Sequence, residues 1–219
     1  MAPRPRTRPK LPEHAIIAAE AEAMVHQILA LPRTDARLLV AIAGPPASGK
    51  STVAAEVARQ LTLQGHKALH VPMDGFHLDN AVLSERGLLH RKGAPETFDA
   101  AGFTHAMRRL STEDEVVLPA FDRARDIAIA GVIPVDSSIR IAVVEGNYLA
   151  FDERPWNTLA EIWDFCTFLD VPEEALSERL VARWRAHGLD DEAAHARALQ
   201  NDLPNARRIL ARRDPARRP

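Results

Sequence analysis

The sequence lacks the features on which disulfide-bonded and membrane-spanning proteins depend. Its single cysteine, Cys166, excludes a disulfide within the chain of 219 residues. No stretch approaches the roughly 18 consecutive apolar residues of a membrane-spanning helix. The first ten residues are basic, but no apolar signal segment follows them. We therefore expect a soluble protein of the cytoplasm that does not act at a membrane.

Aromatic residues are also scarce, at 5% of the chain, and none lies among the basic residues at either end. Residues 1–10 hold four basic side chains and no acid, and residues 207–219 hold six arginines and one acid. Such ends could contact a polyanion or a second subunit, but binding of single-stranded nucleic acid uses aromatic rings that stack on bases. We predict solvated ends, with 1–12 as a flexible basic arm and 214–219 as a frayed tail, and we expect no nucleic-acid partner.

The remaining composition is typical of a globular domain, with 46% apolar and 26% charged residues. Short apolar runs alternate with stretches whose apolar residues recur at helical spacing. The predicted strands are 38–43, 68–73, 139–144 and 162–169, and the predicted helices are 13–31, 50–63, 100–110, 173–187, 191–200 and about 204–213. Residues 74–98 are predicted to form a long functional loop with one helical turn, and 116–118 are ambiguous. This alternation predicts a single α/β domain over 13–213 with a mainly parallel sheet.

The most specific motif is GPPASGKS at 44–51, which fits the phosphate-binding pattern G-x-x-x-x-G-K-[ST] between a predicted strand and a predicted helix. Gly44 and Gly49 allow the backbone to approach a phosphate closely, and the helix N-terminus favours negative charge. Lys50 would reach the β- and γ-phosphates, and Ser51 would hold Mg²⁺. The predicted nucleotide-binding residues are Gly44, Pro45, Pro46, Ala47, Ser48, Gly49, Lys50, Ser51 and Thr52. The motif predicts a bound nucleoside triphosphate with Mg²⁺.

Asp74 directly follows the second predicted strand, in the sequence MDGFH at 73–77. Ligands of open α/β sheets bind at the carboxyl ends of the strands, so Asp74 would lie near the γ-phosphate if this strand neighbours the first. Its carboxylate could then take the proton of an attacking hydroxyl. An Asp before Gly is also a common turn sequence, and its position leaves both roles open.

Two further strands end in an acid that could help to hold Mg²⁺. Glu145 closes the strand 139–144, and an acid at the end of a buried strand after the phosphate-binding loop is the Walker B arrangement of P-loop proteins. Asp170 closes the strand 162–169, but the sequence after it resembles a helix start with acids in the first turn. We predict that Glu145 lies on the metal side and that Asp170 mainly caps the following helix.

Together these segments resemble the branch of the P-loop kinases that contains uridine kinase, pantothenate kinase and phosphoribulokinase. The resemblance is carried by GPPASGKS at 44–51, MDGFH at 73–77, RKGAPETFD at 91–99 and VEGNYL at 144–149, with a weaker match, NDLPNA, at 201–206. It extends over about residues 15–213. Within this branch the chain resembles bacterial proteins whose names associate them with fructose transport or call them nucleoside/nucleotide kinase-like.

The resemblance implies a sheet of strand order 2-3-1-4-5 with helices on both faces and a helical lid. It implies transfer of the γ-phosphate of ATP to a hydroxyl of a sugar, by resemblance of the fructose type, of a nucleoside or of a pantothenate-like molecule. Asp74 resembles the general base, and Ser51 and Glu145 resemble the residues on the metal side. Dimers are common in this branch, so a homodimer is possible.

The residues implied to contact the acceptor are Asp74, His77, Arg91, Lys92, Asp99, Arg123 and Asn147. Arg123 stands where relatives often have histidine, and this departure leaves the acceptor open. His77 replaces an aromatic or aliphatic residue of the uridine and pantothenate enzymes. It is a candidate contact to a sugar hydroxyl, or else a loop histidine bonded to the backbone.

The predicted helix 173–187 stands where these kinases have their lid. Arg179 and Arg183 lie one turn apart beside its apolar stripe, and Arg185 points to the other side. A lid arginine would stabilise charge on the transferring phosphoryl group, so we place Arg179 and Arg183 with Lys50 and Asp74 among the catalytic residues. A solvated helix face is the alternative. From the tail, Asn201 and Asn205 could contact the nucleotide base.

Two other functions remain open from the residues. In a nucleotide monophosphate kinase, Arg91, Lys92 and Arg123 would bind a phosphorylated acceptor. A P-loop regulatory NTPase would act with nucleic acid or with a protein partner, but the sequence contains no N-K-x-D segment and no transporter-ATPase signature. Such a switch would also have no use for the Asp74 and His77 loop.

Overall fold

The computed structural model describes residues 13–32 and 36–214. The predicted basic arm, 1–12, and nearly all of the predicted tail lie outside the described residues. The helices are α1 (Glu13–Leu29), α2 (Lys50–Leu63), α3 (Asn80–Glu85), α4 (Ala100–Thr112), α5 (Glu173–Ala186), α6 (Asp191–Arg197) and α7 (Leu203–Ala211). The strands are β1 (Leu38–Ala43), β2 (Ala68–Pro72), β3 (Val116–Asp122), β4 (Ile127–Val135), β5 (Ile141–Gly146) and β6 (Phe165–Phe168). None of the described helices is both long and apolar enough to cross a lipid bilayer.

Four strands form a parallel sheet in the order β2-β5-β1-β6, which confirms the predicted α/β class. Counted along the chain, the order is 2-3-1-4, as the resemblance implies for these strands. The implied fifth strand does not form in the described part of the chain. Beyond β6 the chain enters α5 to α7, and after α7 the described residues contain only an isolated antiparallel bridge of Arg213 with Phe151.

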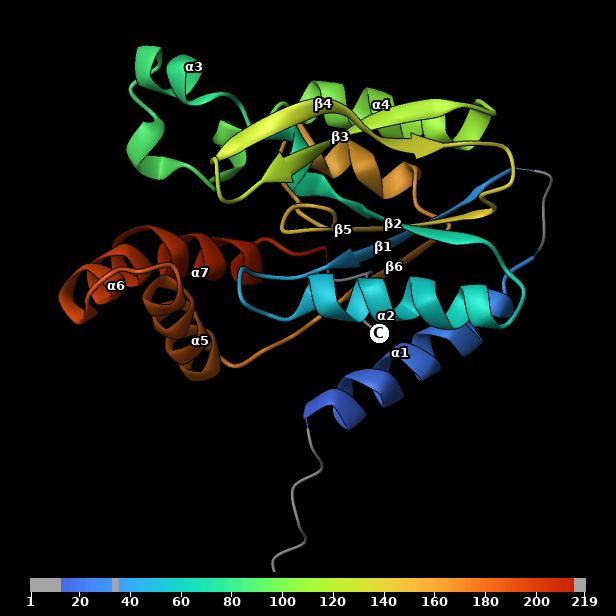
Figure 1. The fold of residues 1–219 in the computed structure, drawn as a ribbon, viewed down its shortest axis with the longest axis horizontal. Helices are drawn as coiled ribbons and strands as arrows, with labels where there is room; N and C mark the ends of the chain where they lie inside the picture. Colours follow the sequence, from blue (N-terminus) through green and yellow to red (C-terminus); the bar gives the residue numbers. More distant parts are fainter. Residues whose placement is uncertain (1–12, 33–35, 215–219) are drawn as a thin grey trace, which may run out of the picture.

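Helices cover both faces of the sheet because its strands are apolar on both sides. Leu39 and Ala41 of β1 pack into one cluster with α4, whereas Val40 and Ile42 pack into a second cluster with α1 and α2. This alternation follows from the two-residue period of a strand. Figure 1 shows α1 and α2 on one side of the sheet and α4 on the other.

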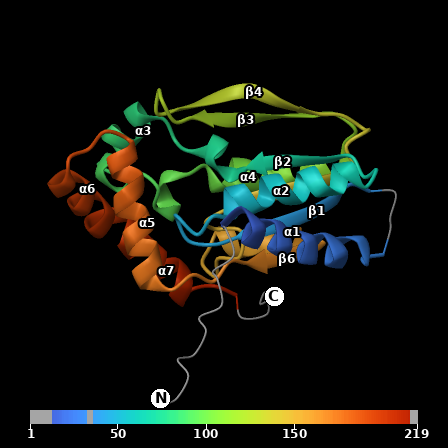
Figure 2. The ribbon, with the colours of Figure 1, turned by 60° about the horizontal axis from the view of Figure 1, so that its bottom comes forward.

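An antiparallel hairpin of β3 and β4 stands apart from this sheet (Figure 2). This hairpin is not among the predicted elements, although the nine uncharged residues from Ile127 to Val135 are a strand signal. The hairpin packs on the turn after β2, where a Cβ on Gly75 would come within 2.3 Å of the Pro119 carbonyl oxygen. Glycine therefore permits the close approach that brings the hairpin tip to the end of β2.

Residues 74–98, predicted as a loop with one helical turn, contain helix α3 and three short 3₁₀ turns. Backbone hydrogen bonds from Leu78 to Thr97 and from Asp99 to Phe76 close the segment at its base. The segment is therefore an ordered excursion that begins and ends beside β2.

Predicted boundaries shift where local helical turns intervene. β6 begins at Phe165 rather than at 162, because the preceding 3₁₀ helix is capped at Ile162. β5 begins at Ile141 rather than at 139. A π-helical turn at Ala198–Asp202 joins α6 to α7. Helices α5 to α7 thus form one lid beside the sheet (Figure 1).

Arg37, directly before β1, ties several segments together at the amino end of the sheet. The residue is 7% exposed, and its side chain donates hydrogen bonds to five backbone carbonyl oxygens. These belong to Leu110, Glu113, Asp114, Asp136 and Ile139. One guanidinium thereby joins the end of α4 to the turn between β4 and β5.

Replacing Arg37 by Met should lower the free energy of unfolding by about 3 kcal/mol, because buried carbonyl groups lose their donors. Urea unfolding followed by circular dichroism measures this change. Arg59→Met, which removes an exposed arginine that pairs with Glu56 on α2, should lower the free energy of unfolding far less, because an ion pair in solvent contributes little. Equal effects of the two substitutions would contradict the role of Arg37.

Candidate active site

The carboxyl edge of the sheet collects the three predicted motifs. β5 lies between β1 and β2 in parallel register, with Glu145 opposite Ile42 of β1 and Pro72 of β2. Because the strands run in the same direction, the chain leaves all three at one edge. The phosphate-binding loop after β1, Glu145 at the end of β5 and Asp74 after β2 therefore meet there.

The loop 44–51 has the backbone that phosphate binding needs. Gly49 has a φ of +90° and Ala47 a φ of +64°, so both lie in the left-handed region. A Cβ on Gly44 would come within 2.8 Å of the Ser48 hydroxyl oxygen. Helix α2 begins at Lys50 without a side-chain cap, so its first N–H groups are open to an anion.

Ser51 and Glu145 place two hard oxygen ligands beside this loop. Glu145 is 4% exposed and accepts a hydrogen bond from the Ser51 hydroxyl over 2.8 Å, and Lys50 Nζ lies 3.9 Å from its other oxygen. These oxygens fit Mg²⁺, which is usually held by one or two protein ligands, water and substrate phosphates. The described residues contain no cluster of three or more His, Cys, Asp or Glu that could hold a metal alone. His70 of β2, which no motif marks, lies 3.8 Å from Glu145.

Asp170, the alternative acid for the metal, lies outside this arrangement. Its carboxylate is 59% exposed and pairs with Arg213 at 2.6 Å. The prediction that Asp170 caps the next helix is wrong, because α5 follows Pro172 and has no side-chain cap. The Asp170 carboxylate forms an ion pair with Arg213 of the C-terminal segment instead.

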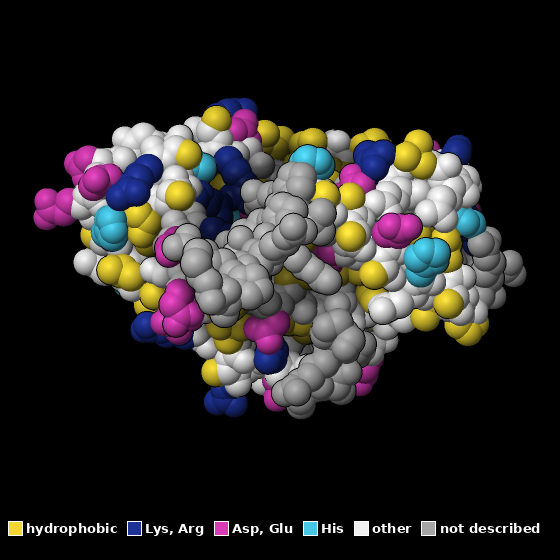
Figure 3. All heavy atoms as spheres, turned by 90° about the horizontal axis from the view of Figure 1, so that it is seen from below, with side chains coloured by type: hydrophobic (Ala, Val, Ile, Leu, Met, Phe, Trp, Pro, Cys, Tyr) yellow, Lys and Arg dark blue, Asp and Glu magenta, His cyan; other side chains and the backbone are white. Residues whose placement is uncertain are grey.

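A cavity of about 420 Å³ lies between the phosphate-binding loop and the lid. The predicted site residues that line it are Pro46, Ala47, Gly49, Lys50, Ser51, Thr52, Asp74, His77, Lys92, Arg123, Asn147, Arg183 and Asn205. The predicted residues outside its lining are Gly44, Pro45, Ser48, Arg91, Asp99, Glu145, Arg179 and Asn201. Seen from below, Lys and Arg side chains gather at a hollow beside the lid helices (Figure 3).

Asp74 and Arg123 form an ion pair inside the cavity. Arg123, at the hairpin tip, donates to Asp74 Oδ2 over 2.5 Å. Burial raises the pKa of the Asp74 carboxyl, but neighbouring charges outweigh it and bring the pKa below its usual value. These charges are His77, which is protonated at the acidic pH where the carboxyl titrates, and the cations Arg123, Lys50 and Arg183. Asp74 is therefore ionised at neutral pH, as a general base must be.

His77 lies in an aromatic wall of the cavity, with its ring centroid 4.0 Å from that of Phe98 and 4.6 Å from that of Phe121. Its Nδ1 lies 2.8 Å from the carbonyl oxygen of Asp74, which can only accept, so Nδ1 carries the proton. Burial lowers the pKa of His77, against the opposing effect of Asp74. The ring is therefore neutral at neutral pH. It is bonded to the backbone, and Nε2 is a hydrogen-bond acceptor.

Comparison with known proteins places this geometry in a family, although no family model matches the chain. A candidate fructose transport system kinase from Silicibacter sp. TM1040, known from its crystal structure, is 51% identical. The TM-score is 0.86, and the match covers 92% of this chain and 97% of that one. The uncharacterized Escherichia coli protein YggC is 35% identical over 191 residues, which are 85% of this chain and 79% of that protein. A candidate uridine kinase of Schizosaccharomyces pombe, C227.14, is 34% identical over 180 residues, which are 77% of this chain and 76% of that protein.

The chain belongs to the uridine kinase branch of the P-loop kinases. Pantothenate kinases and a phosphoribulokinase also match, the phosphoribulokinase at 16% identity and therefore in fold alone. These matches confirm the predicted family and fold class of this P-loop kinase.

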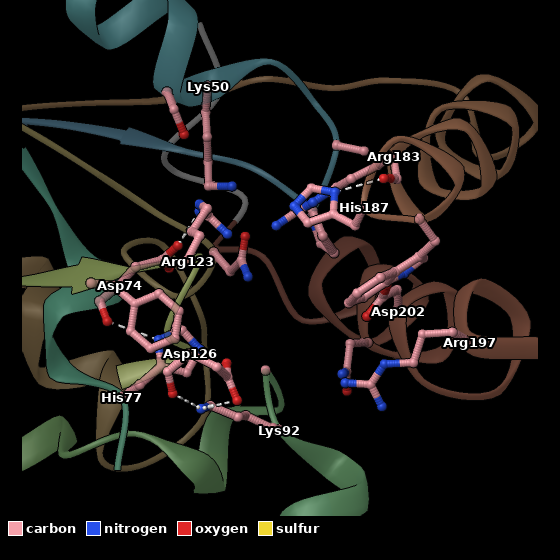
Figure 4. A pocket seen from close by; sticks show the side chains of 18 of the residues that line it. Lys50, Asp74, His77, Lys92, Arg123, Asp126, Arg183, His187, Arg197 and Asp202 are labelled. Carbon is pink, nitrogen blue, oxygen red and sulfur yellow. Dashed lines mark hydrogen bonds and ion pairs between the residues drawn. The ribbon is translucent and has the colours of Figure 1, made fainter. Parts of the chain in front are cut away.

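Among the lid arginines of this kinase, Arg183 lines the cavity. Arg179 lies outside it and donates to the carbonyl oxygen of Ala47, at 3.4 Å. Arg185 pairs with Asp191 of α6 and takes no part in the cavity. Figure 4 shows Arg183 across the cavity from Lys50, Asp74 and Arg123. Arg183 is thus the lid arginine best placed to meet a phosphate.

Two residues predicted to contact the acceptor serve their own segments in the structure. Arg91 pairs with Glu96 at 2.8 Å within the loop 88–98. Asp99 caps α4, where its carboxylate accepts a hydrogen bond from Gly102 N–H over 2.8 Å. Neither side chain lines the cavity, so their predicted role has no support from their positions.

Several residues that line the cavity are marked by no sequence motif. They are Phe121 and Asp126 of the hairpin and Trp184, His187 and Arg197 of the lid, whereas Asp202 of the lid belongs to the weaker match at 201–206. Trp184 donates to Asp202 over 2.6 Å, and the Arg197 guanidinium lies 5.2 Å from the centroid of the Trp184 ring. Tertiary packing brings these residues to the phosphate-binding loop. The strand signal at 127–135 could have indicated the hairpin, and only the match at 201–206, which contains Asp202, indicates a residue of this lid group.

Arg123→Gln should raise the pKa of the Asp74 carboxyl, because a neighbouring positive charge is lost. A low pKa in the folded state stabilises the protein above the ordinary pKa of Asp, and this stabilisation disappears as the pH falls through the folded value. The variant should lose it at a higher pH. Carboxyl ¹³C NMR during acid titration measures the Asp74 pKa directly.

Arg125→Gln is the matched control, because Arg125 belongs to the same hairpin tip but lies near Asp122 and does not line the cavity. It should leave the titration of Asp74 unchanged. An unchanged Asp74 pKa in Arg123→Gln would contradict the ion pair.

Proposed function

We propose that the protein transfers the γ-phosphate of ATP to a hydroxyl group of a small molecule. The observation that carries the proposal is the position of Asp74. Its ionised carboxylate lines the same cavity as Lys50 and Ser51, beside the strand end that carries Glu145. A P-loop protein that only hydrolyses its nucleotide has no need of a base placed for a second substrate.

The residues divide the work by their positions. Lys50 and the N–H groups of the loop would bind the phosphates, and Ser51, with Glu145 acting through water, would hold Mg²⁺. When bound, Mg²⁺ neutralises charge that develops on the β- and γ-phosphates. Arg183 would stabilise the same charge from the lid. Asp74 would orient the acceptor hydroxyl and take its proton.

The lid makes a second contribution to this chemistry. Helices α5 to α7 cover the cavity from the side opposite the hairpin (Figure 4). Exclusion of water by the lid would limit transfer of the phosphoryl group to water, which otherwise competes with the acceptor. The Arg179 contact to Ala47 would hold α5 against the phosphate-binding loop.

The class of acceptor is proposed from the similarity of this chain to its relatives. The Silicibacter relative suggests a sugar of the fructose type, and the uridine and pantothenate kinase relatives suggest a nucleoside or a pantothenate-like molecule. A nucleotide monophosphate kinase and a regulatory NTPase remain the alternatives. The cytoplasmic location and the homodimer stay predictions.

ADP release with Mg-ATP, measured against a panel of acceptors, tests the proposed function. The panel contains fructose and other sugars, uridine, cytidine, pantothenate, ribulose 5-phosphate and nucleoside monophosphates. One acceptor should raise ADP release well above the rate with water alone. Asp74→Asn should reduce that acceptor-dependent rate by about 10²- to 10⁴-fold, because the general base is lost.

Asp170→Asn removes an exposed carboxylate outside the cavity and should leave the rate unchanged. A full acceptor-dependent rate in Asp74→Asn would refute the role of Asp74. If no small molecule stimulates ADP release but nucleic acid or a protein partner does, the regulatory NTPase takes the place of the kinase.

A further inference from the structure

We call the part of the cavity lined by Asp74, His77, Lys92, Arg123, Asp126 and Asn147 its acceptor end. The basic side chains of this end are paired with acidic side chains of the protein. Lys92 and Arg123 line this end and could recognise a charged acceptor, and each forms an ion pair, as does Arg91 outside the cavity lining. The pairs are Arg91 with Glu96 at 2.8 Å, Lys92 with Asp126 at 2.9 Å and Arg123 with Asp74 at 2.5 Å. We propose that the acceptor is an uncharged polyhydroxyl compound and that Asp126 enforces this choice by holding the ammonium group of Lys92. The inference rests on the proposed function and narrows it.

Lys92 is enclosed by its partners. Its side chain is 9% exposed, and Nζ lies 2.7 Å from the Asn80 side-chain oxygen and 2.9 Å from both the carbonyl and a carboxylate oxygen of Asp126. The ammonium group also lies 5.1 Å from the centroid of the Phe121 ring. An ammonium has three N–H donors, and these contacts use them all. A phosphate or carboxylate group of an acceptor could bind Lys92 only if the contacts of its ammonium group with Asn80 and Asp126 were broken.

The hairpin places Asp126 for this contact. Asp126 has a φ of +56°, in the left-handed region that Asp tolerates better than most residues. Its carboxylate also accepts a hydrogen bond from the Asn80 amide over 2.8 Å. Burial raises the pKa of Asp126, but Asn80 and Lys92 outweigh it and bring the pKa below its usual value. The carboxylate that faces Lys92 is therefore ionised at neutral pH.

The remaining cations of the cavity lie elsewhere. Lys50 belongs to the phosphate-binding loop, and Arg183 faces the cavity from the lid (Figure 4). Arg197, also in the lid, covers the Trp184 ring and donates to the carbonyl oxygen of His90. Apart from Lys50 and Arg183, which would hold the phosphates of ATP, the described residues that line the cavity near Asp74 offer a charged acceptor no unpaired cation.

The acceptor end offers hydrogen-bond acceptors instead. These are the Asp74 carboxylate, His77 Nε2 and the side-chain oxygen of Asn147, which is buried and has no partner among the described residues. The hydroxyl groups of a polyol can donate to all three. An anionic group would bring negative charge close to Asp74 and Asp126, which opposes its binding.

Matched acceptors that differ by a charged group test the proposal. The pairs are fructose and fructose 1-phosphate, uridine and uridine monophosphate, and panthenol and pantothenate. In each pair that turns over, the uncharged member should have the higher kcat/KM, by about tenfold or more. Its KM should change little with ionic strength, because no charged group of the acceptor is recognised.

Asp126→Asn keeps the size of the side chain and one of its oxygens but removes the charge that compensates Lys92. The preference for the uncharged acceptor should then fall by about tenfold, because Lys92 becomes available to an anion. Asp122→Asn is the matched control, since it makes the same change in the same hairpin tip outside the cavity lining. It should leave the preference unchanged.

Each outcome separates the proposal from the kinase function on which it rests. A higher kcat/KM for the charged member in the wild type would overturn the proposal and leave the kinase intact. So would an unchanged preference in Asp126→Asn. If no acceptor of either kind raises ADP release above the rate with water, the proposed function fails and this inference falls with it.

Discussion

The parallel pairing of β5 between β1 and β2 is the constraint on which the site depends. Its register sets Glu145 opposite Ile42 of β1, just before the phosphate-binding loop, and opposite Pro72 of β2, just before Asp74. A shift of one residue would turn Glu145 to the other face of the sheet. The Ser51 hydroxyl would then lose its bond to Glu145, and the two residues could no longer hold Mg²⁺ together as we propose. Apolar packing on both faces of β5 holds this register.

Two ion pairs of the β3–β4 hairpin add charged contacts to the site that the sheet assembles. The hairpin tip brings Arg123 to Asp74 and Asp126 to Lys92, so one turn contacts both the end of β2 and the loop 88–98. The first pair helps to keep the Asp74 carboxylate ionised, and the second compensates the charge of Lys92. A glycine at position 75 permits this approach of the hairpin backbone. The hairpin therefore links the fold to the choice of acceptor that we propose.

The sequence predicts those parts of the site whose chemistry is local. The loop 44–51 needs its glycines, lysine and serine in one short segment, and apolar runs mark the four parallel strands. Contacts over long distances in the chain are not predictable in this way. The sequence predicts that Arg123 contacts the acceptor. Its ion pair with Asp74 depends on a hairpin whose position is set by tertiary packing. Asp126 lies in a turn that resembles any other until Lys92 is beside it.

Calorimetric binding of a non-hydrolysable ATP analogue, with Mg²⁺ and with EDTA, tests the central claim that Glu145 stands on the metal side. The wild type should bind the analogue more tightly when Mg²⁺ is present. Glu145→Gln, which retains an oxygen for the Ser51 bond, should lose this difference, whereas Asp170→Asn should keep it. Loss of the Mg²⁺ effect in Asp170→Asn, with its retention in Glu145→Gln, would contradict the account.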